Sequence, residues 1–175
     1  MALGIGSAGA RIVSALSKET TQVDRFAYLS CDPSDLESVE GEKVLIDCPI
    51  DQKLTPPMVR GLSIPRQSDI ARLVEGARVV FIISGLGRAT GSGLAPVVSQ
   101  LASESGADTV SIAVMPFGFE EKLRFYAGVA LRRLRQTSRG VVVVDNDALL
   151  KTSSNETLKD LSWREGFVLA PLIAT

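Results

Sequence analysis

Short apolar runs alternate with amphipathic segments along most of the chain. Six of these runs predict strands, and most of the six are rich in Val and Ile, which indicates strands buried on both faces, as in parallel sheets. The predicted strands cover residues 2–5, 25–30, 43–46, 79–84, 109–115 and 140–144. Between them, apolar residues recur every three or four positions, which predicts crossover helices. The predicted helices cover residues 10–18, 68–76, 94–105 and 120–137.

The order of these elements predicts an α/β fold with a three-layer, doubly wound parallel sheet. The chain has 175 residues, of which 45% are hydrophobic, so we expect one compact domain with a single sizeable core. Residues 48–67 contain four prolines, which predicts a long loop that is functional or mobile. In open sheets of this kind, ligands bind at the carboxyl ends of the strands. The glycine-rich segments of this chain fall at those ends.

Composition removes several classes of function. Lys and Arg total 19 against 20 Asp and Glu, without a basic block, so nucleic acid is not an expected partner. The chain has no histidine, which excludes Ser-His-Asp and Cys-His nucleophilic sites. Its apolar runs fall short of the roughly 20 residues that a membrane span needs, and Cys31 and Cys48 fit no disulfide or zinc pattern. We therefore expect a cytoplasmic protein with reduced thiols and without direct membrane insertion.

The first glycine loop, Gly-Ile-Gly-Ser-Ala-Gly at residues 4–9, lies between a predicted strand and a predicted helix. Its spacing fits G-x-G-x-x-G, in which backbone amides approach a phosphate at the start of the helix. Asp32 follows the second predicted strand and would suit a dinucleotide fold, where an acid binds a ribose. This loop alone leaves three interpretations open: a nucleotide site, a nicotinamide or flavin oxidoreductase, and a tight turn without a ligand.

A second glycine loop follows the fourth predicted strand. Residues 84–93, Ser-Gly-Leu-Gly-Arg-Ala-Thr-Gly-Ser-Gly, would bring a second set of amides to the same crevice. Dinucleotide folds rarely need two such loops. The segment, with the Ala-Pro-Val that follows, resembles the signature loop of the FtsZ/tubulin family, roughly Gly-Gly-Gly-Thr-Gly-Ser/Thr-Gly. The matching residues are Gly87, Thr90, Gly91, Ser92 and Gly93.

Three further segments carry the same resemblance, in the family's order. Residues 115–124 resemble the FtsZ segment Lys-Pro-Phe-x-Phe-Glu-Gly-x-x-Arg, whose Glu and Arg reach the ribose and its surroundings. Residues 146–150 resemble Asn-Asp-x-Leu-Leu, whose Asn helps to read the guanine. The first loop, continued to residue 12, is similar to Gly-Gln-x-Gly-Asn-Gln-Ile of tubulin. The resemblance implies the tubulin-type, Rossmann-like fold with the strand order 3-2-1-4-5-6.

The resemblance also implies a guanine nucleotide site that takes GTP or GDP, in a cytoskeletal or cell-division protein that self-associates or binds FtsZ-like homologues. Hydroxyls of Thr90 and Ser92 would donate to phosphates or bind a water of a Mg²⁺ ion. Glu120 would bind ribose hydroxyls, and Asn146, with Asp147 as a second candidate, would bind a base edge. The expected nucleotide-binding residues are Gly6, Ser7, Ala8, Ala10, Arg11, Gly87, Arg88, Ala89, Thr90, Gly91, Ser92, Glu120, Arg124, Asn146 and Phe167.

The chain departs from the family where phosphate binding is at stake. Arg88 and Ala89 replace glycines, and a Cβ at each restricts positive φ angles and obstructs close approach to a phosphate. Arg88 could instead offer its guanidinium as a charged clamp. Residues 60–65 stand where FtsZ has a glycine-rich loop around the γ-phosphate, and Pro65 lacks an amide donor there. Pro171 occupies about the place of a base-contacting Asn or Asp.

The chain stops where the family's central helix would begin, so we expect a single GTP-binding domain over residues 1–175, without the second domain. In the family, that second domain carries the acidic loop that completes hydrolysis in a neighbouring subunit. We therefore expect nucleotide binding, with hydrolysis only if a partner supplies the acids. Two alternatives remain: a nucleotide-free interaction or scaffold module of the same fold, and a dinucleotide-binding oxidoreductase domain.

Overall fold

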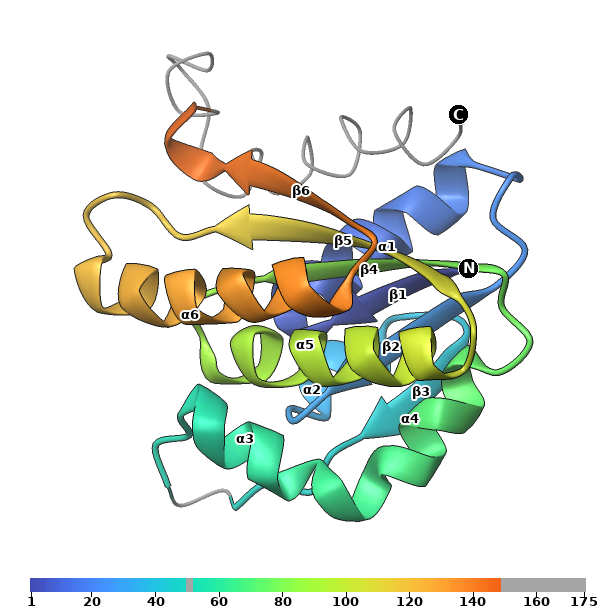
Figure 1. The fold of residues 1–175 in the computed structure, drawn as a ribbon, viewed down its shortest axis with the longest axis horizontal. Coiled ribbons are helices and arrows are strands. Elements are labelled where there is room, and N and C mark those ends of the chain that lie inside the picture. Colours follow the sequence, from blue (N-terminus) through green and yellow to red (C-terminus); the bar gives the residue numbers. More distant parts are fainter. Residues whose placement is uncertain (50–51, 149–175) are drawn as a thin grey trace.

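The computed structural model describes residues 1–49 and 52–148. Within these residues, six strands form one sheet in the order β3-β2-β1-β4-β5-β6 (Figure 1). All neighbouring strands run parallel. The doubly wound α/β fold and the strand order expected from the sequence are therefore confirmed. The strands are β1 (Ala2–Ile5), β2 (Phe26–Ser30), β3 (Glu42–Leu45), β4 (Val79–Gly85), β5 (Asp108–Met115) and β6 (Gly140–Asp145).

Helices cover both faces of this sheet (Figure 1). Each of the four predicted helices is present, and the first and third of them begin within the glycine loops that precede them, at Gly6 and Ala89. None of the helices among the described residues combines the length and the apolar character that crossing a membrane requires. The helices are α1 (Gly6–Glu19), α2 (Ser34–Glu37), α3 (Pro56–Leu62), α4 (Gln67–Val74), α5 (Ala89–Glu104) and α6 (Glu121–Thr137), with a 3-10 turn at Ile64–Arg66.

The predicted loop at residues 48–67 was wrong in its second half, because α3 lies there. Pro56 and Pro57 occupy the first turn of α3. A proline is tolerated in that turn, since its missing N–H would have had no partner within the helix. The proline-rich composition thus marked the start of a helix rather than an irregular segment.

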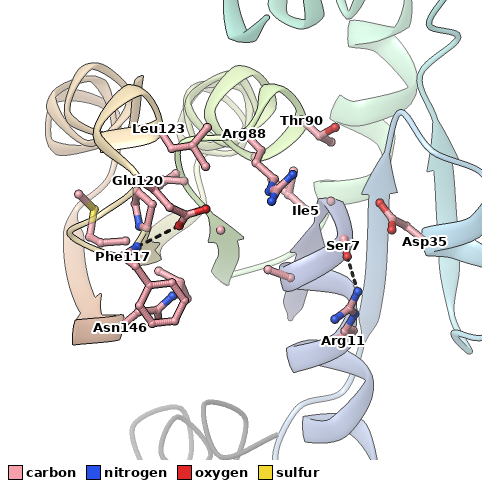
Figure 2. A pocket seen from close by; sticks show the side chains of 18 of the residues that line it. Ile5, Ser7, Arg11, Asp35, Arg88, Thr90, Phe117, Glu120, Leu123 and Asn146 are labelled. Atoms are coloured by element: carbon pink, nitrogen blue, oxygen red, sulfur yellow. Dashed lines mark hydrogen bonds between the residues drawn. The ribbon is translucent and has the colours of Figure 1, made fainter. Parts of the chain in front are cut away.

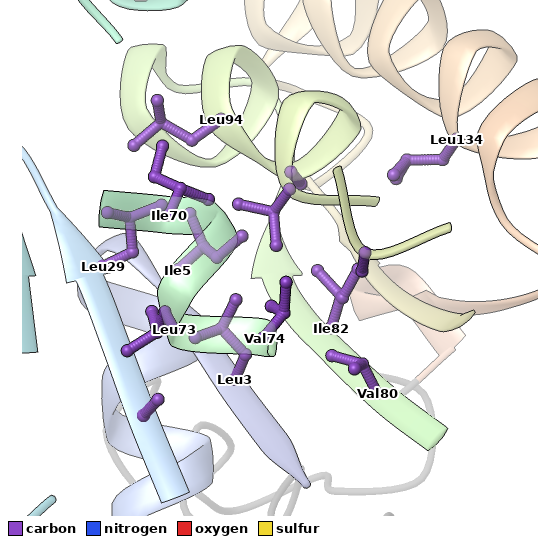
Figure 3. Close-up of a cluster of buried hydrophobic side chains, with 14 of the residues drawn as sticks. Leu3, Ile5, Leu29, Ile70, Leu73, Val74, Val80, Ile82, Leu94 and Leu134 are labelled. Atoms are coloured by element: carbon purple, nitrogen blue, oxygen red, sulfur yellow. The ribbon is translucent and has the colours of Figure 1, made fainter. Parts of the chain in front are cut away.

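Two apolar clusters fill the spaces on either side of the sheet. Alternate residues of a strand point to opposite faces, so Ile82 belongs to one cluster and its neighbour Ile83 to the other. The first cluster joins the sheet to α4, α5 and α6, and Figure 3 shows Leu29 next to Ile70 and Leu3 near Val74, with both partners on α4. The second cluster joins the sheet to α1 and α2. These two layers of packing give the three-layer architecture.

The strand register brings the two glycine loops together. Ile5, the last residue of β1, lies opposite Ser84 near the end of β4. The chain leaves β1 toward α1 on one face and leaves β4 toward α5 on the other, so the strand order reverses between them. A crevice opens at such a reversal, and it is where α/β proteins of this kind bind ligands.

Candidate functional site

A pocket of about 740 Å³ lies at the carboxyl ends of the strands. Segments far apart in the sequence form its wall: both glycine loops, the turn after β2, the turn after β5 and the residue after β6 (Figure 2). The lining residues are Ile5, Gly6, Ser7, Ala8, Arg11, Asp32, Ser34, Asp35, Gly85, Leu86, Arg88, Thr90, Gly91, Val114, Met115, Pro116, Phe117, Phe119, Glu120, Leu123 and Asn146.

The first glycine loop, residues 4–9, divides between the end of β1 and the first turn of α1. Gly6 begins the helix with a φ of 66°, a left-handed conformation that a side chain would strain. Ser7 and Ala8 follow on the pocket wall, and the Ser7 hydroxyl accepts a hydrogen bond of 3.0 Å from the Arg11 guanidinium (Figure 2). The backbone amides at the start of α1 therefore lie at the pocket, where an anion is favoured.

The second loop keeps its turn despite the two side chains that replace glycines. The left-handed residue is Gly87, with a φ of 102°, whereas Arg88 has a φ of −84° and Ala89 is the first residue of α5. No non-glycine among the described residues has a positive φ. The expected restriction at Arg88 and Ala89 therefore does not arise, because neither position needs the conformation that a Cβ disfavours.

Ser92 stabilises the second glycine loop by a hydrogen bond on the side away from the pocket. Its hydroxyl is buried and accepts a 2.7 Å hydrogen bond from the Gly87 N–H. Both groups were expected to face a phosphate, but in this conformation they bind each other and neither residue lies on the pocket wall. Thr90 and Gly91 do line the pocket, and so does the Arg88 side chain.

The turn between β5 and α6 is fixed by two carboxylates. Glu120 accepts a 3.1 Å hydrogen bond from the Phe117 N–H, and Asp147 accepts one of 3.0 Å from the Gly118 N–H. Asp147 also pairs with Arg124 at 3.4 Å. Arg124 is thus paired with Asp147 and is not among the pocket-lining residues, and the exposed ion pair with Glu120, the simplest structural alternative, does not form among the described residues.

Asn146 is a pocket-lining side chain with a hydrogen-bond acceptor available to a ligand. It directly follows β6, on the pocket wall, and its Oδ1 is buried without a hydrogen-bond partner among the described residues (Figure 2). Leaving a buried acceptor unpaired costs about 1–3 kcal/mol. Nearby, the rings of Phe117 and Phe119 stack with centroids 5.3 Å apart, and Phe119 is 74% exposed. A flat ligand with N–H donors would suit this end of the pocket.

Two acids after β2 complete the wall. Asp32 accepts hydrogen bonds from the backbone N–H and the hydroxyl of Ser34, at 2.9 and 2.7 Å, and these bonds hold the pKa of Asp32 below its ordinary value. Asp35 accepts a 2.7 Å bond from the Ser30 hydroxyl. The sequence analysis noted Asp32 but missed Ser34 and Asp35. Their position just after a strand at the ligand-binding edge is the signal that would have found them.

The structure brings most of the expected nucleotide-binding residues together, although not all of them. Ala10, Gly87 and Ser92 are buried behind the wall, and Ala89 and Arg124 lie beside it. Phe167 and Pro171 fall outside the described residues. The segment at residues 60–65 contributes nothing to the wall. The expected residues that do line the pocket are Gly6, Ser7, Ala8, Arg11, Arg88, Thr90, Gly91, Glu120 and Asn146.

Comparison with known proteins identifies this arrangement. The sequence model described as "Tubulin/FtsZ family, GTPase domain" matches residues 63–154, more than half of the chain. The chain belongs to the Tubulin/FtsZ family. The matched segment includes the second glycine loop, the turn after β5 and Asn146. Because the matched domain is a GTPase domain, the oxidoreductase alternative finds no support.

Curated relatives in the Tubulin/FtsZ family are cell division proteins. The chain is 36% identical over 159 residues to FtsZ of Methanothermobacter thermautotrophicus, which covers 87% of this chain. It is 31% identical over 163 residues to FtsZ 1 of Archaeoglobus fulgidus. The chain spans 42% and 43% of the lengths of these two relatives.

Solved structures of family members share the fold over nearly the whole chain. The FtsZ dimer of M. jannaschii matches 99% of this chain and 52% of its own, with a TM-score of 0.87 and 27% identity. CetZ from Methanosaeta thermophila matches 98% of this chain with a TM-score of 0.82, and its 21% identity shows the common fold alone.

Proposed function

We propose that this chain binds GTP or GDP in the pocket at the strand ends, as the nucleotide-binding domain of an FtsZ-like cytoskeletal or cell-division protein. The observation that carries the proposal is the buried, unpartnered Oδ1 of Asn146, on the same pocket wall as the two glycine loops. The Tubulin/FtsZ GTPase-domain match over residues 63–154 supports it.

The phosphates would lie between the two glycine loops. The N-termini of α1 and α5 both meet the pocket there, and each helix end favours an anion by about 0.3–2 kcal/mol in addition to its hydrogen bonds. Gly85 and Gly91 line that wall, and the lack of a Cβ at each allows the two glycine loops to pack closely against each other and against the end of β4. This end of the pocket would fix the nucleotide without reading its base.

The base and ribose would lie toward β5 and β6. Asn146 Oδ1 would accept from an N–H of the base edge, which would end its isolation. The exposed ring of Phe119 offers a stacking surface. One carboxylate oxygen of Glu120 binds the turn, and its other oxygen is available to ribose hydroxyls.

A Mg²⁺ ion would fit the chemistry of this wall, because Asp32 and Asp35 supply the hard oxygen ligands that it prefers. Its role would be to offset the charge of the phosphates and to polarise them.

Hydrolysis and self-association form the second part of the proposal. Acids from a neighbouring subunit would complete the reaction, so turnover of GTP should rise more steeply than linearly with protein concentration.

Calorimetric titration with GDP and GTP, with ATP and NAD as controls, tests the binding step. We expect guanine nucleotides to bind more tightly than ATP. Asn146→Ala should weaken GDP binding about tenfold, the equivalent of one hydrogen bond of about 1.4 kcal/mol, and should reduce the preference over ATP. Gln100→Ala removes an exposed amide far from the pocket wall and serves as the matched control.

The nucleotide-free interaction module is the second candidate. The segment at residues 60–65, which stands in place of the family's γ-phosphate loop, has no residue on the pocket wall, and this favours a weakened site. If the titrations show no heat with any nucleotide, and the protein is folded by circular dichroism, the interaction module is correct and the binding proposal is wrong.

A further inference from the structure

Cys31 and Cys48 follow the carboxyl ends of two neighbouring strands, β2 and β3. The strands pair in register up to their ends, and the Ile46 N–H extends the pairing with a 2.9 Å hydrogen bond to the Ser30 carbonyl. Leu29 of β2 and Ile46 both face the first apolar cluster, and side chains alternate between the two faces of a sheet. Each cysteine stands two residues beyond one of these, so both point to the same face, where both pack against that cluster.

The two thiols are direct neighbours in the folded protein. Burial raises the pKa of the Cys31 thiol to about 12, and the adjacent Cys48 thiol is the next largest cause. The Thr90 hydroxyl also faces Cys31 and partly offsets this rise, whereas the Asp35 carboxylate adds to it. Both cysteines are free and partly buried. They are the only two in the chain, so neither has another cysteine of the same chain to react with.

Cys31 also borders the pocket at the strand ends. The next residue, Asp32, lines the pocket wall together with Asp35, and Thr90 lines it from the start of α5 (Figure 2). Both acids are held in the turn after β2 by hydrogen bonds to neighbouring serines. A covalent bond from Cys31 to Cys48 would draw the start of this turn toward the end of β3 and away from Thr90. Chemistry at the two thiols would therefore move one wall of the pocket.

We propose that Cys31 and Cys48 form an oxidisable dithiol, and that its closure to an intramolecular disulfide weakens nucleotide binding in the adjoining pocket. The effect on binding rests on the proposed function, whereas the formation of the disulfide does not. The oxidant is a low-molecular-weight disulfide. One protein thiolate attacks it, releases a small thiol and leaves a mixed disulfide; the second then attacks the protein sulfur of that mixed disulfide and releases the other small thiol. Two protein thiols are oxidised while one small disulfide is reduced to two thiols.

Cys48 makes the first attack. The thiolate is the attacking species, and with a pKa of about 12 the Cys31 thiol is almost entirely protonated at neutral pH. Once Cys48 carries the small thiol, the attack by Cys31 is intramolecular, and its high effective concentration compensates for the small thiolate fraction. Cys31→Ser should therefore accumulate a stable mixed disulfide on Cys48, whereas Cys48→Ser should react about tenfold more slowly or less. Equal rates for the two variants would refute this order.

The test compares the reduced wild type with the same protein after incubation with oxidised glutathione and removal of the reagent. Mass spectrometry should show the loss of two hydrogen atoms, and peptide mapping should join residues 31 and 48 within a chain that remains monomeric in non-reducing electrophoresis. Calorimetric titration with GDP in Mg²⁺ should give an affinity about tenfold lower for the oxidised protein, and a reductant should restore it. This comparison uses the wild type alone, so a folding defect of a variant cannot imitate the result.

The double variant Cys31→Ser/Cys48→Ser is the control, and the same treatment should leave its GDP affinity unchanged. If the wild type instead acquires two separate mixed disulfides or a bond between two chains, the dithiol is refuted. If the internal disulfide forms but GDP affinity stays within about threefold, the effect on the pocket is refuted and the proposed function stands. If the reduced wild type binds no guanine nucleotide, the proposed function and the effect on the pocket are both wrong, and the mass alone decides whether the disulfide forms.

Discussion

Gly91 sits at the start of α5 in a place where no side chain fits. A Cβ there would overlap the carbonyl oxygen of Gly85, which belongs to the end of β4 and cannot move without disturbing the sheet. We predict that Gly91→Ala lowers the free energy of unfolding by about 1–3 kcal/mol, as overpacking does, and weakens nucleotide binding by shifting the loop. Urea unfolding and calorimetric titration would measure the two effects.

Gly128 is the matched control for Gly91. It lies in the interior of α6, and nothing stands within 4 Å of the place of its Cβ. Gly128→Ala should therefore raise the free energy of unfolding by up to about 1 kcal/mol, because alanine is the better helix former. Equal destabilisation by both substitutions would contradict the account of close packing at Gly91.

Cys31 should make the stability of the protein depend on pH in the alkaline range. Burial, followed by its neighbour Cys48, raises the pKa of the Cys31 thiol from 9.0 to about 12. Between these values the unfolded chain releases a proton that the folded chain keeps, so the stabilisation is complete below pH 9.0 and is lost as the pH rises toward about 12. Urea midpoints on both sides of pH 9.0 would measure it.

Cys31→Ala should flatten that dependence without abolishing it. Burial also raises the pKa of Tyr28, which contributes a decline of the same sign above its ordinary value of 10.0. An unchanged slope in Cys31→Ala would show that the Cys31 thiol ionises normally in the folded protein.

At the scale of elements, the turn between β5 and α6 depends on Asp147, which lies just after the end of β6. Asp147 holds the Gly118 N–H and the Arg124 guanidinium, and so joins the end of β6 to the segment that carries Phe119 and Glu120. We predict that Asp147→Ala loosens this turn, with faster amide exchange at Gly118 and several-fold weaker GDP binding. Global stability should change by less than about 1 kcal/mol, since the pair is partly exposed to solvent.

Asp108→Ala provides the comparison for Asp147. It removes an equally simple pair, with Arg139 at 2.6 Å, but at the opposite end of β5. Amide exchange in the pocket and GDP binding should remain as in the wild type. If Asp108→Ala weakens GDP binding as much as Asp147→Ala, the effect comes from general loss of charge pairs rather than from the turn.

At the scale of the whole molecule, the two apolar clusters share one sheet and should unfold together. Ile82 and Ile83 are neighbours in β4 yet belong to different clusters, so neither layer can lose its packing while the other keeps it. We predict a single calorimetric transition for this chain, with equal calorimetric and van't Hoff enthalpies.

Leu94→Ala tests that cooperativity. Leu94 is fully buried in the cluster between the sheet and α5. The substitution should cost about 2–5 kcal/mol and should move the whole transition to lower temperature. Two separate transitions, with only one of them shifted, would show that the layers are independent folding units.

The sequence by itself determined the layout of the fold. Continuous apolar runs and three-to-four spacing located the sheet and the main helices, because burial on two faces and burial on one face impose different periods on the chain. The glycine loops, together with the resemblance to the FtsZ/tubulin family, gave the expected ligand, and nine of the expected residues line the pocket. These signals come from residues close together in the sequence, so they can be recognised without the tertiary structure.

Only the tertiary structure decided how side chains within the site divide their roles. Spacing could not show that Ser92 binds Gly87, that Arg124 turns to Asp147, or that α3 begins at two prolines. Each of these depends on what lies across a turn or on the next strand, and hydrogen-bond partners and free space are properties of the packed chain. For the same reason, the Asn146 oxygen could be seen to lack a partner among the described residues only once the strand ends had met.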